Sequence, residues 1–328
     1  MQALRRSLLI LRASSAASRL ESRNFQKYVA PTYKAFLSKK KKMGRLADPH
    51  PRNTFAEWNY DAELYAFGQR LRENFEPEIL KQALLDVSYL EKRKIEQEEV
   101  GIEPELNLEH NGEMANTGNR LMSLYVEQYL TTTIPKLPKK YIKNIRDHLI
   151  SDDMHAHIGK QLGLSDLILC DEYPPTPEIL VRAFRSVIQA LAISSGADRA
   201  CGLVRDLVVA QIAGQDLTLF CSPENPLKEL EEHLKSTNQQ PPEPRLISVI
   251  GQNFILSSYD VGVYSNKIMI GRGFGESAET AQNMACCDAL WRAWDVTVRR
   301  KPISFKLELP PLEKFDVSVK TPSRPVVT

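Results

Sequence analysis

Residues 179–196 read ILVRAFRSVIQALAISSG, and this stretch decides how the middle of the chain folds. Arg182, Arg185 and Gln189 recur at a helical spacing, so they share one face. Apolar side chains recur every three or four residues on the opposite face, as in an amphipathic helix; they are Leu180, Ala183, Phe184, Val187, Ile188 and Leu191. The periodicity by itself predicts a core helix with a basic stripe on its solvent side.

The whole chain has the composition of a globular protein with a basic beginning. Of its 328 residues, 42% are hydrophobic and 26% are charged, which suits about two domains with tails. No apolar run approaches the ~18 residues that a membrane span needs. Residues 1–46 hold twelve Lys or Arg and one acid, Glu21, which leaves 31 basic and 40 acidic residues elsewhere. The folded part is therefore mildly acidic.

Cysteine and histidine usage argues against a metal centre. The five cysteines are odd in number and form no Cys-x-x-Cys, so buried reduced thiols are the simplest expectation. His155 and His157 are two residues apart, a poor spacing for one helix face. The sequence predicts no disulfide framework, no zinc site and no cofactor.

The opening stretch resembles the second signature helix of ribonuclease III domains, which reads A-D-T-F-E-A-L-I-G-A before a small turn. The matching residues are Phe184, Val187, Ile188, Ala190 and the turn Ser194-Ser195-Gly196. Residues 83–89 resemble an earlier element of that family, A-L-T-H-x-S-Y. The two carboxylates that bind metal in the family fall on Arg182 and Arg185 in this sequence.

Residues 116–130 resemble the first signature of the same family, N-E-R-L-E-F-L-G-D. Arg120-Leu121 and Leu124 set the alignment, which places the three acids of the signature on Asn119, Met122 and Val126. None of these is acidic. Glu127 is one residue late, which turns it about 100° away on a helix.

The resemblance implies metal-assisted hydrolysis of a phosphodiester, in which carboxylates hold Mg²⁺ and the ion activates water. Cationic, amide and alkyl side chains at the five positions cannot supply the anionic oxygens that Mg²⁺ requires. We therefore expect no metal at this place and no hydrolysis. Arg182 and Arg185 could instead hold RNA phosphates or an acidic neighbour, or they could pair with acids inside the fold.

The pattern changes after residue 222 to helix, three strands and helix, at 227–235, 246–250, 258–264, 267–272 and 277–294. This order resembles the double-stranded-RNA-binding domain. The family begins its last helix with K-K-x-A-K, whereas this chain has Ala278, Glu279, Ala281 and Gln282. The candidate RNA contacts that remain are Arg245, Lys267 and Arg272. We expect weak binding to free duplex RNA.

The N-terminal region carries two basic segments with different expected roles. Residues 1–25 are rich in Arg and Ser and poor in acids, which is typical of a mitochondrial transit peptide. The alternative is a basic tail of a cytosolic or nuclear protein. Four lysines follow, Lys39, Lys40, Lys41 and Lys42, which are either solvated or in contact with RNA phosphate.

The predicted fold class is α+β, with an all-α ribonuclease III-like domain followed by an α-β-β-β-α double-stranded-RNA-binding domain. The expected boundaries are 1–25 for the transit peptide, 26–56 for a basic extension, 57–214 and 223–295 for the two domains, and 296–328 for an extended tail. The run WNYDAELYAFG at residues 58–68 is similar to that of a family of mitochondrial large-subunit ribosomal proteins, the one numbered forty-four.

This second resemblance implies a structural role in the mitochondrial ribosome, within the matrix. The partners that it implies are large-subunit rRNA, neighbouring ribosomal proteins, and a second copy or a related ribonuclease III-like chain. Two other functions stay open, a mitochondrial endonuclease for double-stranded RNA and an adaptor that delivers RNA to another nuclease. The missing carboxylates favour the structural role over the endonuclease.

Overall fold

The computed structural model describes residues 31–39, 42, 52, 55, 57–101, 110–251, 257–297, 307 and 309. The chain divides into two compact units, residues 1–54 and 55–328. The expected transit peptide, Lys40, Lys41 and nearly all of the expected C-terminal tail lie outside the described residues. Lys39 and Lys42 are described, and both are helical and exposed.

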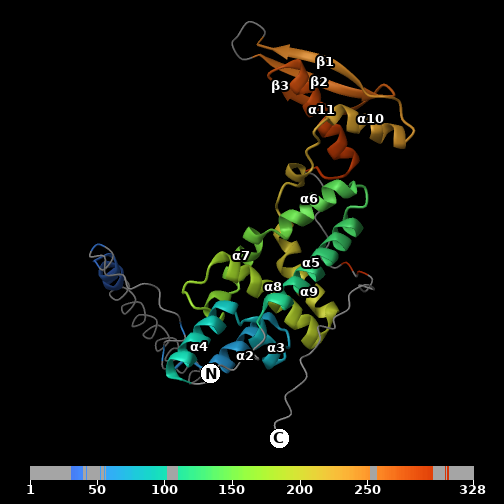
Figure 1. Ribbon diagram of the computed structural model, residues 1–328. Coiled ribbons are helices and arrows are strands. Elements are labelled where there is room, and N and C mark those ends of the chain that lie inside the picture. Colours follow the sequence, from blue (N-terminus) through green and yellow to red (C-terminus); the bar gives the residue numbers. More distant parts are fainter. Residues whose placement is uncertain are drawn as a thin grey trace, which may run out of the picture. The chain divides into compact units, whose positions relative to one another are not determined.

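The larger unit begins with helices and continues into a three-stranded sheet followed by a last helix, which confirms the α+β fold class (Figure 1). The helices are α2 (Tyr60–Leu71), α3 (Pro77–Ala83), α4 (Val87–Val100), α5 (Gly112–Thr133), α6 (Lys139–Leu149), α7 (Asp152–Gln161), α8 (Pro177–Ser195) and α9 (Ala197–Leu207). Short 3-10 turns follow at η2 (Leu164–Asp166), η3 (Val209–Ile212) and η4 (Leu217–Phe220). Among the described residues, no helix is long and apolar enough to cross a membrane.

Helix α8 is the central element of the helical part and corresponds to the opening stretch of the sequence. It packs against α3, α5, α7 and α9 (Figure 1). Pro177 occupies its first turn, where a missing N–H costs nothing, and Gly196 ends it with φ +95°. The apolar face is buried, and Ser186 and Gln189 are buried too. Neighbouring helices therefore cover part of the polar face of α8 as well as its apolar face.

Helices α5 and α8 meet at Gly118. A Cβ atom added there would collide with the backbone carbonyl oxygen of Arg185 and lie 3.4 Å from Cβ of Gln189. Only a residue without a side chain permits this approach. The contact sets the distance between the two helices that flank the candidate site.

Two helix boundaries differ from what the sequence pattern indicates. The apolar spacing of residues 77–94 predicts a single helix, but the helix is broken between α3 and α4. Asp86 causes the break, because its carboxylate accepts hydrogen bonds from the N–H and Oγ of Ser88 at 3.2 and 2.9 Å and starts α4 as its N-cap. The acidic and weakly apolar residues 96–113 predict a loop, and this prediction is wrong at both ends, since α4 continues to Val100 and α5 begins at Gly112.

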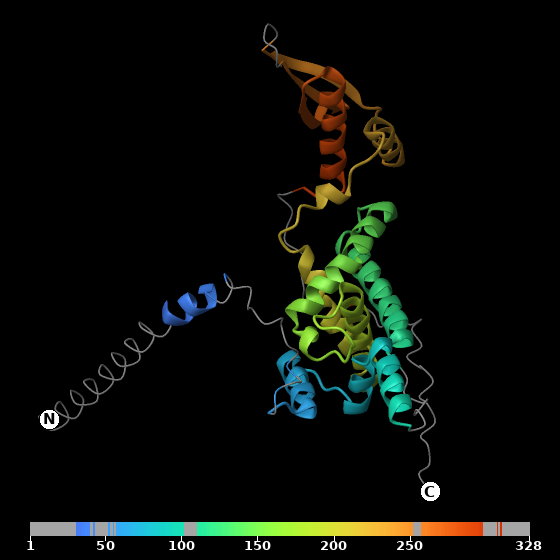
Figure 2. The same ribbon diagram turned by 60° about the vertical axis from the view of Figure 1, so that its left-hand side comes forward.

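The C-terminal part has α10 (Pro226–Ser236), an antiparallel sheet of β1 (Glu243–Ile250), β2 (Ser258–Ser265) and β3 (Ile268–Gly275) in that order, and α11 (Ala278–Ala293). The expected element order is confirmed. The sequence favours a hairpin turn at Ser265-Asn266, whereas the turn is one residue later, at Asn266-Lys267, both with positive φ. Figure 2 shows α11 along one face of this sheet. Ser277 and Thr280 cap α11 reciprocally.

Candidate functional site

Arg182 and Arg185 lie one turn apart on α8 and line a concavity of about 750 Å³. The opening of α5 and the first turn of α7 form its other walls. The remaining lining residues are His110, Gly112, Glu113, Ala115, Asn116, Asp152, Asp153, Pro177, Glu178 and Val181. This is the place where the ribonuclease III resemblance predicts the metal site.

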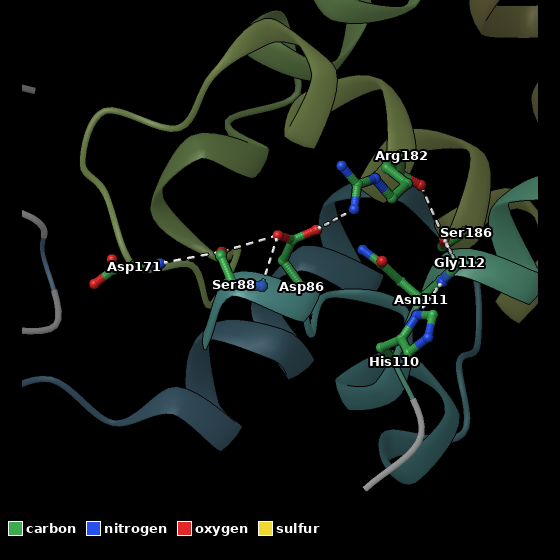
Figure 3. Close-up of polar contacts among 8 residues, drawn as sticks. All are labelled: Asp86, Ser88, His110, Asn111, Gly112, Asp171, Arg182 and Ser186. Carbon is green, nitrogen blue, oxygen red and sulfur yellow. Dashed lines mark hydrogen bonds and ion pairs between the residues drawn. The ribbon is translucent and has the colours of Figure 1, made fainter. Parts of the chain in front are cut away.

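Arg182 is held by a buried carboxylate (Figure 3). Its Nη1 lies 3.2 Å from Oδ1 of Asp86, whose side chain is only 3% exposed, whereas the side chain of Arg182 is 36% exposed. The other carboxylate oxygen of Asp86 caps α4 through Ser88. In turn, the backbone N–H of Asp171 donates to Oγ of Ser88 at 3.4 Å. One buried acid thus joins the α4 N-terminus to α8.

Ser186 and Asn111 extend this polar region toward α5 (Figure 3). Oγ of Ser186 lies 2.9 Å from the carbonyl oxygen of Asn111 and 2.8 Å from that of Arg182. Both residues are buried. The hydroxyl therefore ties α8 to the residue that precedes α5 and fixes the wall of the concavity.

Arg185 makes three contacts within the fold. Its Nη2 donates to Oδ1 of Asp152 at 2.6 Å and to the carbonyl oxygen of Ile150 at 3.4 Å. Its Nε donates to Nδ1 of His155 at 3.1 Å. Together with the Arg182 ion pair, these contacts match the second of the two alternatives, in which the arginines pair with acids inside the fold.

The Arg185 contact sets the ionisation of His155. The imidazole is fully buried, packs on the ring of Phe184 with centroids 5.3 Å apart, and accepts a hydrogen bond at Nδ1 from Nε of Arg185. Burial, and then the positive charge of Arg185, lower the pKa of His155 from 6.5 to about 3. The ring is therefore neutral at physiological pH. His157, by contrast, is exposed, so the two histidines lie in different environments and do not face one another as a metal pair would.

The Asp86 pair gives a testable effect on stability. We expect Asp86→Asn to lower the free energy of unfolding by about 1–2 kcal/mol, because the amide can still cap α4 but no longer neutralises Arg182. The loss stays below that of a fully buried pair since Arg182 is partly solvated. Urea titration followed by circular dichroism measures it. The control Asp61→Asn breaks an exposed pair with Lys81 and should change stability by less than about 0.5 kcal/mol; equal effects would contradict the role of Asp86.

The structure corrects the expected positions of the acids on α5. Met122 and Val126 are 0% exposed in the hydrophobic core, so neither can face the concavity. The α5 residues that line it are Gly112, Glu113, Ala115 and Asn116, two turns nearer the start of the helix. Glu127 instead forms an ion pair with Arg146 at 2.7 Å.

A register seven residues earlier fits both the signature and the structure. It places N-E-R-L-E-F-L-G-D on residues 111–119, with Asn on Asn111 and Gly on Gly118, the glycine that α8 requires. The three acids of the signature then fall on Gly112, Ala115 and Asn119, and none is acidic in this register either. The signal in the sequence that could have identified this register is the spacing of seven residues between Asn111 and Gly118.

The concavity does not suit the Mg²⁺ that the fold family implies. Its five corresponding positions hold glycine, alanine, asparagine and two arginines that are already paired with acids. Within the described ranges, no group of three or more His, Cys, Asp or Glu side chains could hold a metal ion. The exposed Glu113, Asp153 and Glu178 make no ion pair among the residues that the structure describes, and these carboxylates would repel phosphate.

The other candidate RNA contacts lie on the C-terminal sheet and in its hairpin turn. Arg245 and Arg272 are each bonded to a carboxylate, at 2.7 Å from Glu243 and 2.7 Å from Asp260 respectively. Lys267 is exposed in the hairpin turn. The first turn of α11 carries Glu279 but no cation.

The five cysteines are free thiols, and all except the half-buried Cys170 are buried. This confirms the expectation of reduced cysteines. Burial raises the pKa of Cys201 and Cys221 to about 12, and of Cys286 and Cys287 to about 11. Because the thiolate is the reactive form, these residues serve as core side chains.

Comparison with known proteins assigns both parts of the chain to one family. The model "Large ribosomal subunit protein mL44, endonuclease domain" matches residues 59–191, and "MRPL44 dsRNA-binding domain" matches residues 221–324. A relative from Caenorhabditis elegans, "Large ribosomal subunit protein mL44", is 33% identical over 257 residues, or 76% of this chain. The chain belongs to the mL44 family. It spans 64% of the length of that nematode relative.

More distant matches are ribonucleases. "Ribonuclease 3" from Albidiferax ferrireducens is 26% identical over 191 residues, which cover 56% of this chain and 82% of that protein. The nuclease domain of ribonuclease III from Campylobacter jejuni matches with a TM-score of 0.39 and 21% identity, over 46% of this chain and 97% of the other. Membership of the mL44 family thus accompanies similarity to ribonuclease III sequences, while the acids of the family signatures are missing from this chain.

Proposed function

We propose that the chain is a structural component of the large subunit of the mitochondrial ribosome and that its ribonuclease III-like fold does not cut RNA. The observation that supports this most directly is the identity of five residues, Gly112, Ala115, Asn119, Arg182 and Arg185. They occupy the positions of the carboxylates in the ribonuclease III signatures. A fold that has replaced these acids can still position surfaces for assembly.

The electrostatics of the concavity support the same proposal. A nuclease site needs carboxylates that hold Mg²⁺, and the ion then neutralises the phosphate. In this chain Asp86 and Asp152 are bound to arginines, so their charge is already satisfied within the protein. The residues therefore stabilise the helical fold, and no step of hydrolysis follows from their arrangement.

The proposed partners are large-subunit rRNA and neighbouring ribosomal proteins in the mitochondrial matrix. The transit peptide at 1–25, the basic extension at 26–56 and the domain boundaries 57–214 and 223–295 belong to this proposal. RNA contacts are assigned first to Lys39, Lys40, Lys41 and Lys42, whose charges are clustered. A pairing with a second copy or a related ribonuclease III-like chain is compatible with it.

Sedimentation tests the assignment to the ribosome. Mitochondrial extract is separated on a sucrose gradient, and the chain is followed by immunoblot together with large-subunit rRNA. We expect both in the same fraction, and a shift of the chain to lighter fractions after ribonuclease A treatment. A light soluble peak in the untreated extract would contradict the proposal and favour the adaptor alternative.

A nuclease assay tests the alternative of an endonuclease. The purified full chain is incubated with double-stranded RNA and Mg²⁺ or Mn²⁺, beside a bacterial ribonuclease III as the positive control. We expect the RNA to stay intact with the chain and to be cut by the control. Cleavage that disappears in an Arg182→Ala, Arg185→Ala variant would overturn the assignment as a non-enzyme.

A further inference from the structure

The C-terminal sheet has one covered and one uncovered face. Helix α11 lies along the first, where Val261 and Val263 are buried (Figure 2). A Cβ atom on Gly271 or Gly273 would collide with the α11 backbone, so β3 also turns these positions toward the helix. Side chains alternate along a strand, so the neighbouring residues line the opposite side. We call this side the open sheet face; it is formed by Arg245, Ile247, Ile250, Tyr264, Met269, Arg272 and Phe274. The β-bulge in the β2–β3 pairing places Met269 on this side although it is two residues from Gly271.

The strand register supports this assignment. Ile250 pairs with Ser258, and Phe274 with Asp260, which lie four and two residues from Gly262 along β2 and therefore on the same side of the sheet. A Cβ atom on Gly262 would meet Cδ1 of Ile247 at 2.9 Å, the ring of Tyr264 at 3.2 Å and the sulfur of Met269 at 3.4 Å. Residues from all three strands therefore meet on the open sheet face.

The open sheet face is apolar and accessible. Ile247, Ile250, Met269 and Phe274 are 44%, 63%, 42% and 54% exposed. The solvated side of an antiparallel sheet ordinarily carries polar residues. Clustered large apolar side chains on one surface indicate an interaction site rather than scattered surface residues.

The cations of this face are neutralised within the sheet. Arg272 donates two hydrogen bonds to Asp260, at 2.9 and 2.7 Å, and its guanidinium lies 5.1 Å from the ring centre of Phe274. Asp260 is buried and also accepts a hydrogen bond from Ser248. These bonds lower the pKa of Asp260, the Arg272 hydrogen bond most, so the pair stays ionised at neutral pH.

The charge balance selects between RNA and protein as the occupant. Arg245 is paired with Glu243 and lies over Tyr264 at 5.5 Å, so it too has its own carboxylate. A phosphate backbone would have to compete with both acids, and the face offers it no unneutralised positive charge in the described residues. An uncharged apolar surface complements the face as it stands.

We propose that the open sheet face binds an apolar segment of a neighbouring protein. Arg245 and Arg272 then shape the surface, through their stacking on Tyr264 and Phe274, instead of holding RNA. The proposal goes beyond the proposed function, because it names a protein contact that can exist in any particle that contains the chain.

Site-specific photocrosslinking tests this inference in the full chain. A benzophenone amino acid replaces Phe274 in one version and the exposed Glu279, at the start of α11, in a control version. After irradiation of intact cells, we expect the version at 274 to form one protein adduct and the control not to form it. Mass spectrometry of the adduct should locate the cross-link in an apolar segment of another protein.

Two further variants show whether the adduct depends on the face. Ile250→Glu places a charge on the open sheet face and removes an apolar contact, so it should lower the yield at position 274 about tenfold or more, which corresponds to about 1.4 kcal/mol. Lys267→Glu changes the hairpin turn and should leave the yield unchanged. Both positions are exposed, and circular dichroism melting of each purified variant checks that the fold is intact.

Four outcomes would overturn the inference. They are an adduct with RNA, an adduct with a second copy of the chain, no adduct at position 274, and an adduct whose yield Ile250→Glu does not reduce. The sedimentation experiment is separate: a protein adduct in a chain that sediments as a light peak would support the contact and contradict the ribosomal assignment.

Discussion

The Gly118→Ala variant should lose about 2–4 kcal/mol of its free energy of unfolding, a large share for one methyl group on a helix. The added Cβ meets the carbonyl oxygen of Arg185, which belongs to the α8 backbone and cannot rotate away. Helices α5 and α8 must therefore separate along the contact that both use in the core. Urea unfolding followed by circular dichroism at 222 nm gives the change.

Gly202 supplies a matched control for this prediction. It lies within α9, and a Cβ atom added there has nothing within 4 Å. Alanine is favoured over glycine in a helix by about 1 kcal/mol, so Gly202→Ala should keep or slightly raise the stability. If both variants changed stability alike, the close approach of α5 and α8 at Gly118 would be wrong.

The elements that depend on local chemistry could be predicted from the sequence. The apolar spacing of residues 179–196, with Pro177 before it and Gly196 after it, is enough to define α8. The strands and α11 were predicted for the same reason, since β-branched runs, a turn and a helix with a small-residue face follow one another. The break at Asp86 was missed, because the same acid could sit on the surface of a continuous helix.

The register of the first signature could not be fixed from the periodicity. Seven residues make almost two full turns, so a shift from residue 119 to residue 112 moves a side chain by only about 20° around the helix axis. Both alignments therefore place each position of the signature on nearly the same face of α5. The contact at Gly118 distinguishes them, and it depends on a helix that lies more than 60 residues away in the sequence.

The ion pairs of the candidate site could not be predicted for a related reason. Arg182 pairs with Asp86 and Arg185 with Asp152, and neither acid belongs to the helix of its arginine. Sequence spacing predicts partners within a helix, whereas these depend on how α4, α7 and α8 pack. The sequence could show that the acids of the signatures are missing, but not what neutralises the arginines that replaced them.

In the two ion pairs, the positive charges belong to the protein itself, whereas in a metal site the positive charge is a bound ion. In the ribonuclease III resemblance, carboxylates on the helix hold a cation that comes from solution. Here the cations are part of α8, and carboxylates from elsewhere in the fold hold them. The arrangement needs no ion to balance charge, so removal of divalent cations should leave the helical part intact.

His155 makes the same region sensitive to acid. Above its ordinary pKa of 6.5, the imidazole is neutral in both the folded and the unfolded chain, so it contributes no pH dependence. Below 6.5 the unfolded chain binds a proton there, whereas the folded chain does not until the pH approaches about 3. The neutral His155 therefore does not reduce the free energy of unfolding above pH 6.5, and this free energy falls as the pH decreases from 6.5 toward 3.

The loss attributable to His155 should reach about 2 kcal/mol at pH 5, since each pH unit in the window costs about 1.4 kcal/mol. Carboxylates titrate nearby, so the comparison is between variants. His155→Asn keeps an oxygen that can accept from Nε of Arg185 but cannot take a proton, and its stability should depend less on pH between 7 and 5. His157→Asn, at an exposed position two residues away, should keep the wild-type dependence. Urea titrations at both pH values measure the difference. If the unfolding free energies of wild type and His155→Asn fell equally between pH 7 and pH 5, the imidazole would be protonated, and not neutral, beside Arg185.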